Sequence, residues 1–89
     1  MYTGITVNGF RVDTTDHFDD QMRERNIQLS DIIKAIKEHP EVFKYNDTGQ
    51  ELCYRSDDVS FMFEVRFGKV VLITGMSWFA EYVRDAIII

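Results

Sequence analysis

Two histidines are the side chains of this chain whose charge changes closest to neutral pH, which makes them the first candidates for acid–base chemistry. His17 lies close in sequence to Asp13 and Asp20, and it could take and return a proton. The alternative is that His17 is an ordinary residue in the first turn of a helix. His39 precedes Pro40 at an expected helix end, where the helix dipole favours an imidazolium, so we expect a structural role for it.

Carboxylates are concentrated just after the N-terminal segment. The acidic residues concerned are Asp13, Asp16, Asp19, Asp20 and Glu24. Their spacing is not that of a calcium loop and no glycine lies among them, so we expect no metal site here. The surface that they form could bind a basic protein partner, and the alternative is that it serves solubility.

Other sequence patterns of catalytic sites are missing. There is no phosphate-binding glycine loop, zinc-ligand spacing or nucleophile elbow, so we expect no cofactor. Cys53 lies outside any pattern typical of a catalytic triad, and we expect a small buried side chain. As the single cysteine it has no internal disulfide partner, which is consistent with a cytoplasmic protein.

The length and the net charge of the chain exclude further classes of protein. A chain of 89 residues with 45% hydrophobic residues predicts one domain, 1–89, with a packed core. No apolar run reaches the roughly 20 residues that a membrane span needs, so we expect no membrane partner. The net charge of −5 opposes general nucleic-acid binding but leaves a local basic patch open.

The elements that position these residues begin with a β-hairpin over residues 5–13. Asn8-Gly9 is the preferred pair for a two-residue type I′ turn. This turn places one set of side chains on the buried face and leaves Thr6 and Arg11 on the other. The buried set is Ile5, Val7, Phe10 and Val12.

Two short helices should follow. Thr14 or Thr15 can cap the first, Phe18 and Met22 form its apolar stripe, and Asn26 can end it in a left-handed conformation. Ser30 is the expected cap of the second helix, and Pro40 stops it. The apolar face of the second helix is Ile32, Ile33 and Ile36.

From Glu41 onward the pattern changes to the period of β-strands. We expect strands at 42–45 and 52–55, then a long strand whose buried residues alternate from Val59 to Phe67. Gly68-Lys69 should turn the chain into a last strand at 70–74. The fold class is therefore α+β, with a hairpin, a helical hairpin and a curled antiparallel meander.

A C-terminal helix is the last expected element, beginning at Ser77 after Gly75 breaks the strand. Its apolar residues nearly encircle it, so one side would stay exposed in a monomer. We therefore keep a homodimer as a hypothesis. Its interface residues would be Trp78, Tyr82, Ile87, Ile88 and Ile89.

Residues 15–27 read Thr-Asp-His-Phe-Asp-Asp-Gln-Met-Arg-Glu-Arg-Asn-Ile. This run is similar to the T-x-H-A-x-x-R-M-x-E-R-G-I motif of a small, largely uncharacterised family with a RelE-like fold. The family continues with a Pro-Glu-Val segment and a strand ending in Thr, which His39-Pro40-Glu41-Val42 and 70–74 match. The resemblance covers roughly residues 10–75 and implies a RelE-like fold.

RelE-like folds include toxins of toxin–antitoxin systems that cleave RNA without a metal. The resemblance implies that His17 matches the motif histidine and Arg25 the motif arginine. Arg55 and Arg66 are candidates only by their place on the strands. In such a site the histidine would move protons and the arginines would stabilise the phosphorane.

Three positions depart from the motif: Phe18 replaces alanine, Gln21 replaces the first arginine and Asn26 replaces glycine. The lost cation and the acidic total favour a non-catalytic binding or inhibitor protein, of the kind that phage and mobile-element genes encode. A metal-independent ribonuclease acting on RNA is the alternative. Clustering of His17, Arg25, Arg55 and Arg66 in one patch would favour catalysis, and scatter would favour binding.

Overall fold

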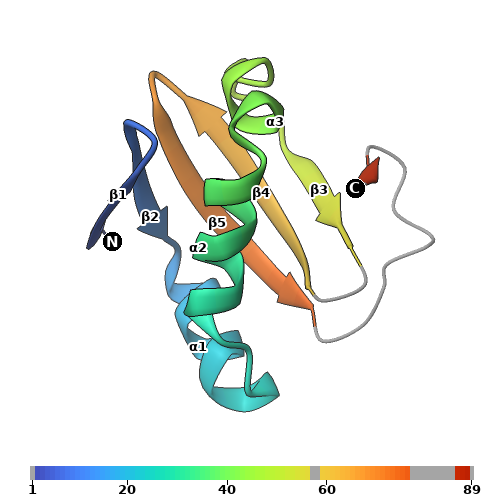
Figure 1. Ribbon diagram of the computed structural model, residues 1–89. Helices are drawn as coiled ribbons and strands as arrows, with labels where there is room; N and C mark the ends of the chain where they lie inside the picture. Colours follow the sequence, from blue (N-terminus) through green and yellow to red (C-terminus); the bar gives the residue numbers. More distant parts are fainter. Residues whose placement is uncertain (1, 57–58, 77–85, 89) are drawn as a thin grey trace.

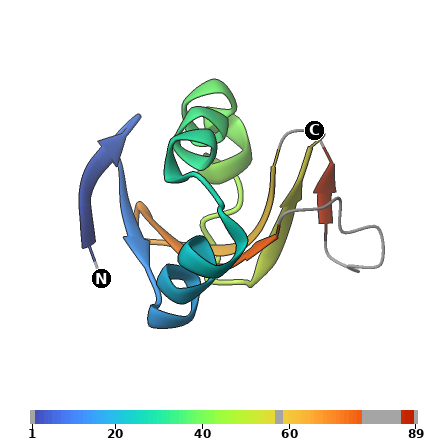
Figure 2. The ribbon, with the colours of Figure 1, turned by 90° about the horizontal axis from the view of Figure 1, so that it is seen from below.

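The computed structural model describes residues 2–56, 59–76 and 86–88. Six strands form one sheet in the order β1-β2-β5-β4-β3-β6, and this sheet curves around α2 and α3 (Figures 1 and 2). Helix α1 lies at the end of the sheet, against β5 (Figure 1). The elements are β1 (Tyr2–Val7), β2 (Phe10–Thr14), α1 (Asp16–Arg25), α2 (Leu29–Glu38), α3 (Pro40–Lys44), β3 (Leu52–Arg55), β4 (Ser60–Arg66), β5 (Lys69–Met76) and β6 (Ala86–Ile88). The α+β class is confirmed, and no helix in the described part of the chain is long and apolar enough to cross a membrane.

The N-terminal hairpin forms where the sequence predicts it. Asn8 and Gly9 both have positive φ, at 52° and 83°, as a type I′ turn requires, and Val7 pairs with Phe10 across it. The Asn8 side chain also donates to the backbone oxygens of Ile36 and Lys37, at 3.4 and 3.2 Å. The turn therefore also satisfies carbonyl groups at the C-terminal end of α2.

Helix α1 begins and ends at the predicted residues. The Thr15 hydroxyl accepts a hydrogen bond from the Phe18 backbone N–H at 3.1 Å, and Asn26 ends the helix with a φ of 52°. Phe18 is fully buried in the core, and Met22 packs against it from a partly buried position. The capping residues at its two ends were therefore sufficient to predict where α1 begins and ends.

Helix α2 corrects the predicted cap. It begins at Leu29, with Gln28 at the N-cap position and no side-chain capping bond, so Ser30 lies inside its first turn. Leu29 packs against the core together with Ile33, next to the fully buried Ile36. The helix therefore begins two residues earlier than a Ser30 cap would allow, and this start includes Leu29, which packs on the core.

The predicted strand at 42–45 is wrong, because residues 40–44 form α3. Pro40 occupies the first turn of this helix, where its fixed φ is favourable and its missing N–H costs nothing. Phe43 is fully buried and stacks on Tyr54 at a ring-centroid distance of 6.2 Å, and it contacts Phe63 at 5.1 Å. The helical conformation of residues 40–44 therefore places Phe43 in contact with this aromatic cluster.

The meander of β3, β4 and β5 is antiparallel as predicted, but the whole sheet is mixed. Strand β2 pairs with β5 in parallel, and β6 pairs with β3 in parallel. After the β4–β5 turn, β5 runs in the same direction as β2. One edge of β5 pairs with β4 and the other edge pairs with β2. The expectation of a purely antiparallel sheet was therefore wrong.

The predicted C-terminal helix falls mostly on residues 77–85, which lie outside the described residues. Ile89 also lies outside them. Ala86, which we expected in this helix, instead begins strand β6, so the prediction was wrong at that residue. Trp78 and Tyr82 of the expected dimer interface are outside the described residues. Ile87 and Ile88 pair through their backbones with Tyr54 and Arg55 of β3.

Candidate functional site

Arg25 lies where α1 meets the end of β5. Its guanidinium donates to the backbone oxygen of Gly75 at 2.8 Å, and the Gly75 N–H donates to the side-chain oxygen of Gln21 at 2.9 Å. Gln21 and Arg25 are four residues apart and so share one face of α1. Both polar groups of the Gly75 backbone are therefore held by α1 beyond the point where β2 ends.

His17 is exposed in the first turn of α1. It precedes Arg25 by eight residues, which corresponds to about 12 Å along a helix axis. The helix therefore places the two residues in its first and last turns rather than side by side.

Arg55 and Arg66 lie at opposite ends of the sheet. Arg55 pairs with Ser60 and is 7% exposed, whereas the exposed Arg66 pairs with Lys69 beside the β4–β5 turn. Ser60 and Arg66 are the first and last residues of β4, and six steps along a strand span about 20 Å. Arg55 shares its end of the sheet with Gly75, which Arg25 binds, because Arg55 pairs with Ser60 and Ser60 pairs with Met76. The separations that the fold imposes are therefore those of His17 from Arg25 and of Arg66 from Arg55.

Cys53 is fully buried in β3, as the sequence predicts. Burial raises the pKa of its thiol, and the positive charge of Arg55 lowers that pKa by a smaller amount. A raised pKa keeps the thiol protonated near neutral pH, which opposes a role as a nucleophile.

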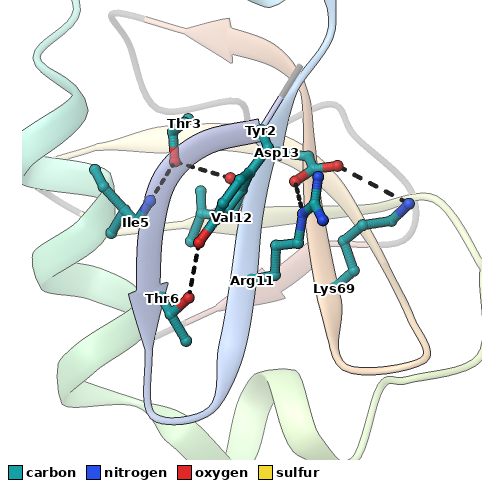
Figure 3. Close-up of polar contacts among 8 residues, drawn as sticks. All are labelled: Tyr2, Thr3, Ile5, Thr6, Arg11, Val12, Asp13 and Lys69. Atoms are coloured by element: carbon teal, nitrogen blue, oxygen red, sulfur yellow. Dashed lines mark hydrogen bonds and ion pairs between the residues drawn. The ribbon is translucent and has the colours of Figure 1, made fainter.

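The acidic residues fall into two groups. Asp13 lies on β2, where it binds Arg11 at 2.9 Å and Lys69 at 3.9 Å (Figure 3). Asp20 binds Arg23 on α1. Within the described ranges, no ion pair involves Asp16, Asp19 or Glu24, and no group of three His, Cys, Asp or Glu side chains could hold a metal ion. The α1 acids, defined here as Asp16, Asp19 and Glu24, thus keep their charge available.

A row of cations crosses the sheet face that is turned away from α2 and α3. Arg11 pairs with Lys69 across β2 and β5, and Lys69 pairs with Arg66 across β5 and β4. The Arg11 guanidinium also lies 4.0 Å from the centre of the Tyr2 ring (Figure 3). The Asn8-Gly9 turn predicted the face of Arg11, but the parallel pairing that joins it to Lys69 had no local signal.

The β4–β5 turn differs from the prediction by one residue. Its corner residues are Phe67 and Gly68, with φ of 54° and 73°, rather than Gly68 and Lys69. Phe67 was expected to continue the buried alternation of β4, but it is 93% exposed. Strand β4 ends at Arg66, so Phe67 leaves the pleat and points away from the core.

The segment before β3 holds this turn in place. The two carboxylate oxygens of Asp47 accept hydrogen bonds from the Phe67 and Gly68 N–H groups, each at 2.8 Å. The Gly49 N–H donates to the Val65 oxygen at 2.8 Å. A hollow of about 280 Å³ lies beside the turn, lined by Asp47, Thr48, Arg66 and Phe67.

The chain was also compared with known proteins. No protein-family model, curated protein or solved structure matches it. The functional argument therefore depends on the surfaces described above.

Proposed function

We propose that this protein is a non-catalytic binding or inhibitor protein on a RelE-like scaffold, of the kind that phage and mobile elements encode. The observation that carries the proposal is the separation of His17 from Arg25 along α1 and of Arg66 from Arg55 along β4. Arg25 binds a backbone oxygen and Arg55 is buried, so two of the three arginines are placed to support the fold. A metal-independent ribonuclease needs its proton-transfer group and its cations around one phosphate.

The α1 acids identify the kind of partner that this proposal favours. Asp16 and Glu24 are exposed and Asp19 is partly exposed, and the three lie on one helix of ten residues. A protein surface rich in Lys and Arg would be attracted to them, with an association rate that falls as salt is added. In this proposal the protein acts in the cytoplasm, where Cys53 stays reduced.

The experiment compares the wild-type chain with a triple charge reversal of the α1 acids, Asp16→Lys, Asp19→Lys and Glu24→Lys. Each is used to capture proteins from its host cells, and captured proteins are identified by mass spectrometry. We expect a basic protein that binds the wild type and is lost with the reversed variant. The matched control reverses three exposed acids outside α1, Asp31→Lys, Glu41→Lys and Glu51→Lys, which makes the same change in net charge and should retain the partner. Equal capture by all three chains would contradict the proposal.

The row formed by Arg11, Lys69 and Arg66 favours a second candidate, the metal-independent ribonuclease. Asp13 pairs with Arg11 and Lys69, so the row keeps a net positive charge of two across three neighbouring strands, and such a surface can bind phosphates. Induced expression of the wild type and of His17→Ala separates the two functions. Growth arrest with cleaved RNA that His17→Ala abolishes would support the ribonuclease. Intact RNA with both chains would support the binding protein.

A further inference from the structure

We propose that the β4–β5 turn is a second binding surface, for a protein segment that carries an apolar side chain next to a carboxylate. Phe67 would contact the apolar side chain and Arg66 would bind the carboxylate. This surface goes beyond the α1 acids, because it lies at the first residue of β5 whereas α1 contacts the end of that strand.

Phenylalanine is an unfavourable residue type for the backbone conformation at position 67. A φ of 54° favours Asn or Gly, and an aromatic residue there is strained. The side chain is 93% exposed, so it recovers almost nothing from burial within the chain. Folding alone gives no reason for phenylalanine at this position, whereas binding does, since buried aromatic anchors dominate protein interfaces.

The turn is also held rigid. Asp47 binds both corner N–H groups at 2.8 Å, which fixes the direction in which Phe67 projects. A backbone that is already ordered before binding loses less conformational entropy in the complex. The Phe67 side chain therefore projects from a backbone position that is set before the partner binds.

The charge of the hollow defines the second feature of the partner. Asp47 uses both carboxylate oxygens on the turn, and the Arg66 guanidinium packs over Gly49, where an added Cβ would lie 2.5 Å from Nη2. Among the described residues, Arg66 has no ion-pair partner. The hollow beside Phe67 is thus lined by a guanidinium that makes no ion pair within the described residues, while the Asp47 oxygens of the same hollow are turned to the backbone N–H groups of the turn. Such a guanidinium can bind a carboxylate in planar, two-point geometry.

Tyr45 adds a second exposed aromatic residue to the segment that holds the turn. It is 75% exposed and lies two residues before Asp47. Aromatic residues and arginine are the residue types enriched where protein interfaces gain most of their energy. We therefore expect the partner segment to be apolar and acidic, and distinct from the basic partner of the α1 acids.

The test uses the full chain and a phage-displayed library of random twelve-residue peptides as the probe. Peptides selected on the wild type are then measured against Phe67→Asn, Arg66→Glu and the control Arg23→Glu. Arg23→Glu makes the same charge change on an exposed residue of α1. We expect selected peptides to combine an apolar residue with Asp, Glu or a free C-terminus. They should bind Phe67→Asn and Arg66→Glu at least about tenfold more weakly, and Arg23→Glu unchanged.

Phe67→Asn also serves as a folding control, because Asn is favoured at this φ and should leave the denaturation midpoint unchanged or raise it. Peptides that bind Phe67→Asn as tightly as the wild type would overturn the proposal, as would the absence of any peptide that prefers the wild type. A selection that yields only lysine-rich peptides, all of them lost with the reversed α1 acids, would also overturn it, while leaving the proposed function intact.

Discussion

Arg25 and Gly75 lie fifty residues apart in sequence, and a 2.8 Å hydrogen bond from the Arg25 guanidinium to the Gly75 backbone oxygen joins them. Gln21 receives the N–H of the same glycine. Helix α1 thus takes the place of a neighbouring strand along the end of β5. Arg25, a candidate catalytic residue only by resemblance to a motif, is part of the contact between a helix and the sheet.

Replacing Arg25 should therefore change stability. We expect Arg25→Met to lower the free energy of unfolding by about 1–2 kcal/mol, because a backbone oxygen loses a charged donor. Urea denaturation followed by circular dichroism measures the change. His17→Ala is the control, since His17 is exposed and should leave the unfolding free energy nearly unchanged. An Arg25→Met variant as stable as the wild type would show that the contact is weak in solution.

A side chain at Gly75 should also destabilise the protein. A Cβ there would lie 2.7 Å from the Ile27 Cδ1 atom and 3.3 Å from the Phe18 ring. We expect Gly75→Ala to cost about 1–3 kcal/mol, which a thermal melt would detect. Because the closest atom is the end of a side chain, Ile27→Ala in the same chain should recover part of the loss. If the double variant shows simple additivity, crowding against Ile27 is not the cause.

Asp47 should hold the β4–β5 turn through its second carboxylate oxygen. Asp47→Asn retains one acceptor and introduces a donor, so one of the two N–H groups of the turn loses its partner. We expect a loss of about 1–2 kcal/mol and faster hydrogen exchange at Phe67 and Gly68. Glu51→Gln, the same chemical change at an exposed position, should alter neither quantity. Unchanged exchange at the turn in Asp47→Asn would contradict this role.

The Cys53 thiol gives a pH dependence with a defined sign. Burial raises its pKa in the folded protein above the ordinary value of 9.0, so the unfolded chain loses this proton at lower pH. The contribution to stability is complete below the pKa of the unfolded chain and is lost as pH rises through the folded pKa. We expect Cys53→Ala to show a shallower fall in stability between about pH 8 and 10. If stability falls equally steeply with pH in the wild type and in Cys53→Ala, the raised pKa of the Cys53 thiol is contradicted.

The parts of the fold that sequence predicts are those with local causes. Asn8-Gly9, the Thr15 cap and the Asn26 end each depend on residues within a few positions, and all three form as expected. Phe43 and Phe67 were misplaced, because the period of two in the sequence continued across both. What decides their positions is distant in sequence: an aromatic cluster for Phe43, and Asp47 for the turn at Phe67.

The candidate binding surfaces show the same division. The α1 acids follow from a single helix and could be predicted. The row of Arg11, Lys69 and Arg66 depends on the parallel pairing of β2 with β5, for which no local pattern exists. The exposed Phe67 carried a misleading signal, because an apolar residue at the end of an alternating strand predicts burial.

The position of β5 between β2 and β4 has a consequence for biosynthesis. Thr15 bonds to the backbone oxygen of Ile73 across 58 residues, and β2 has no neighbour but β1 until β5 is present. A two-stranded hairpin alone is marginally stable in water. Until residues 69–76 have been translated, the β1–β2 hairpin and α1 therefore lack the strand that they pack on. The sheet can assemble only after β5 is made, and such long-range pairing slows folding.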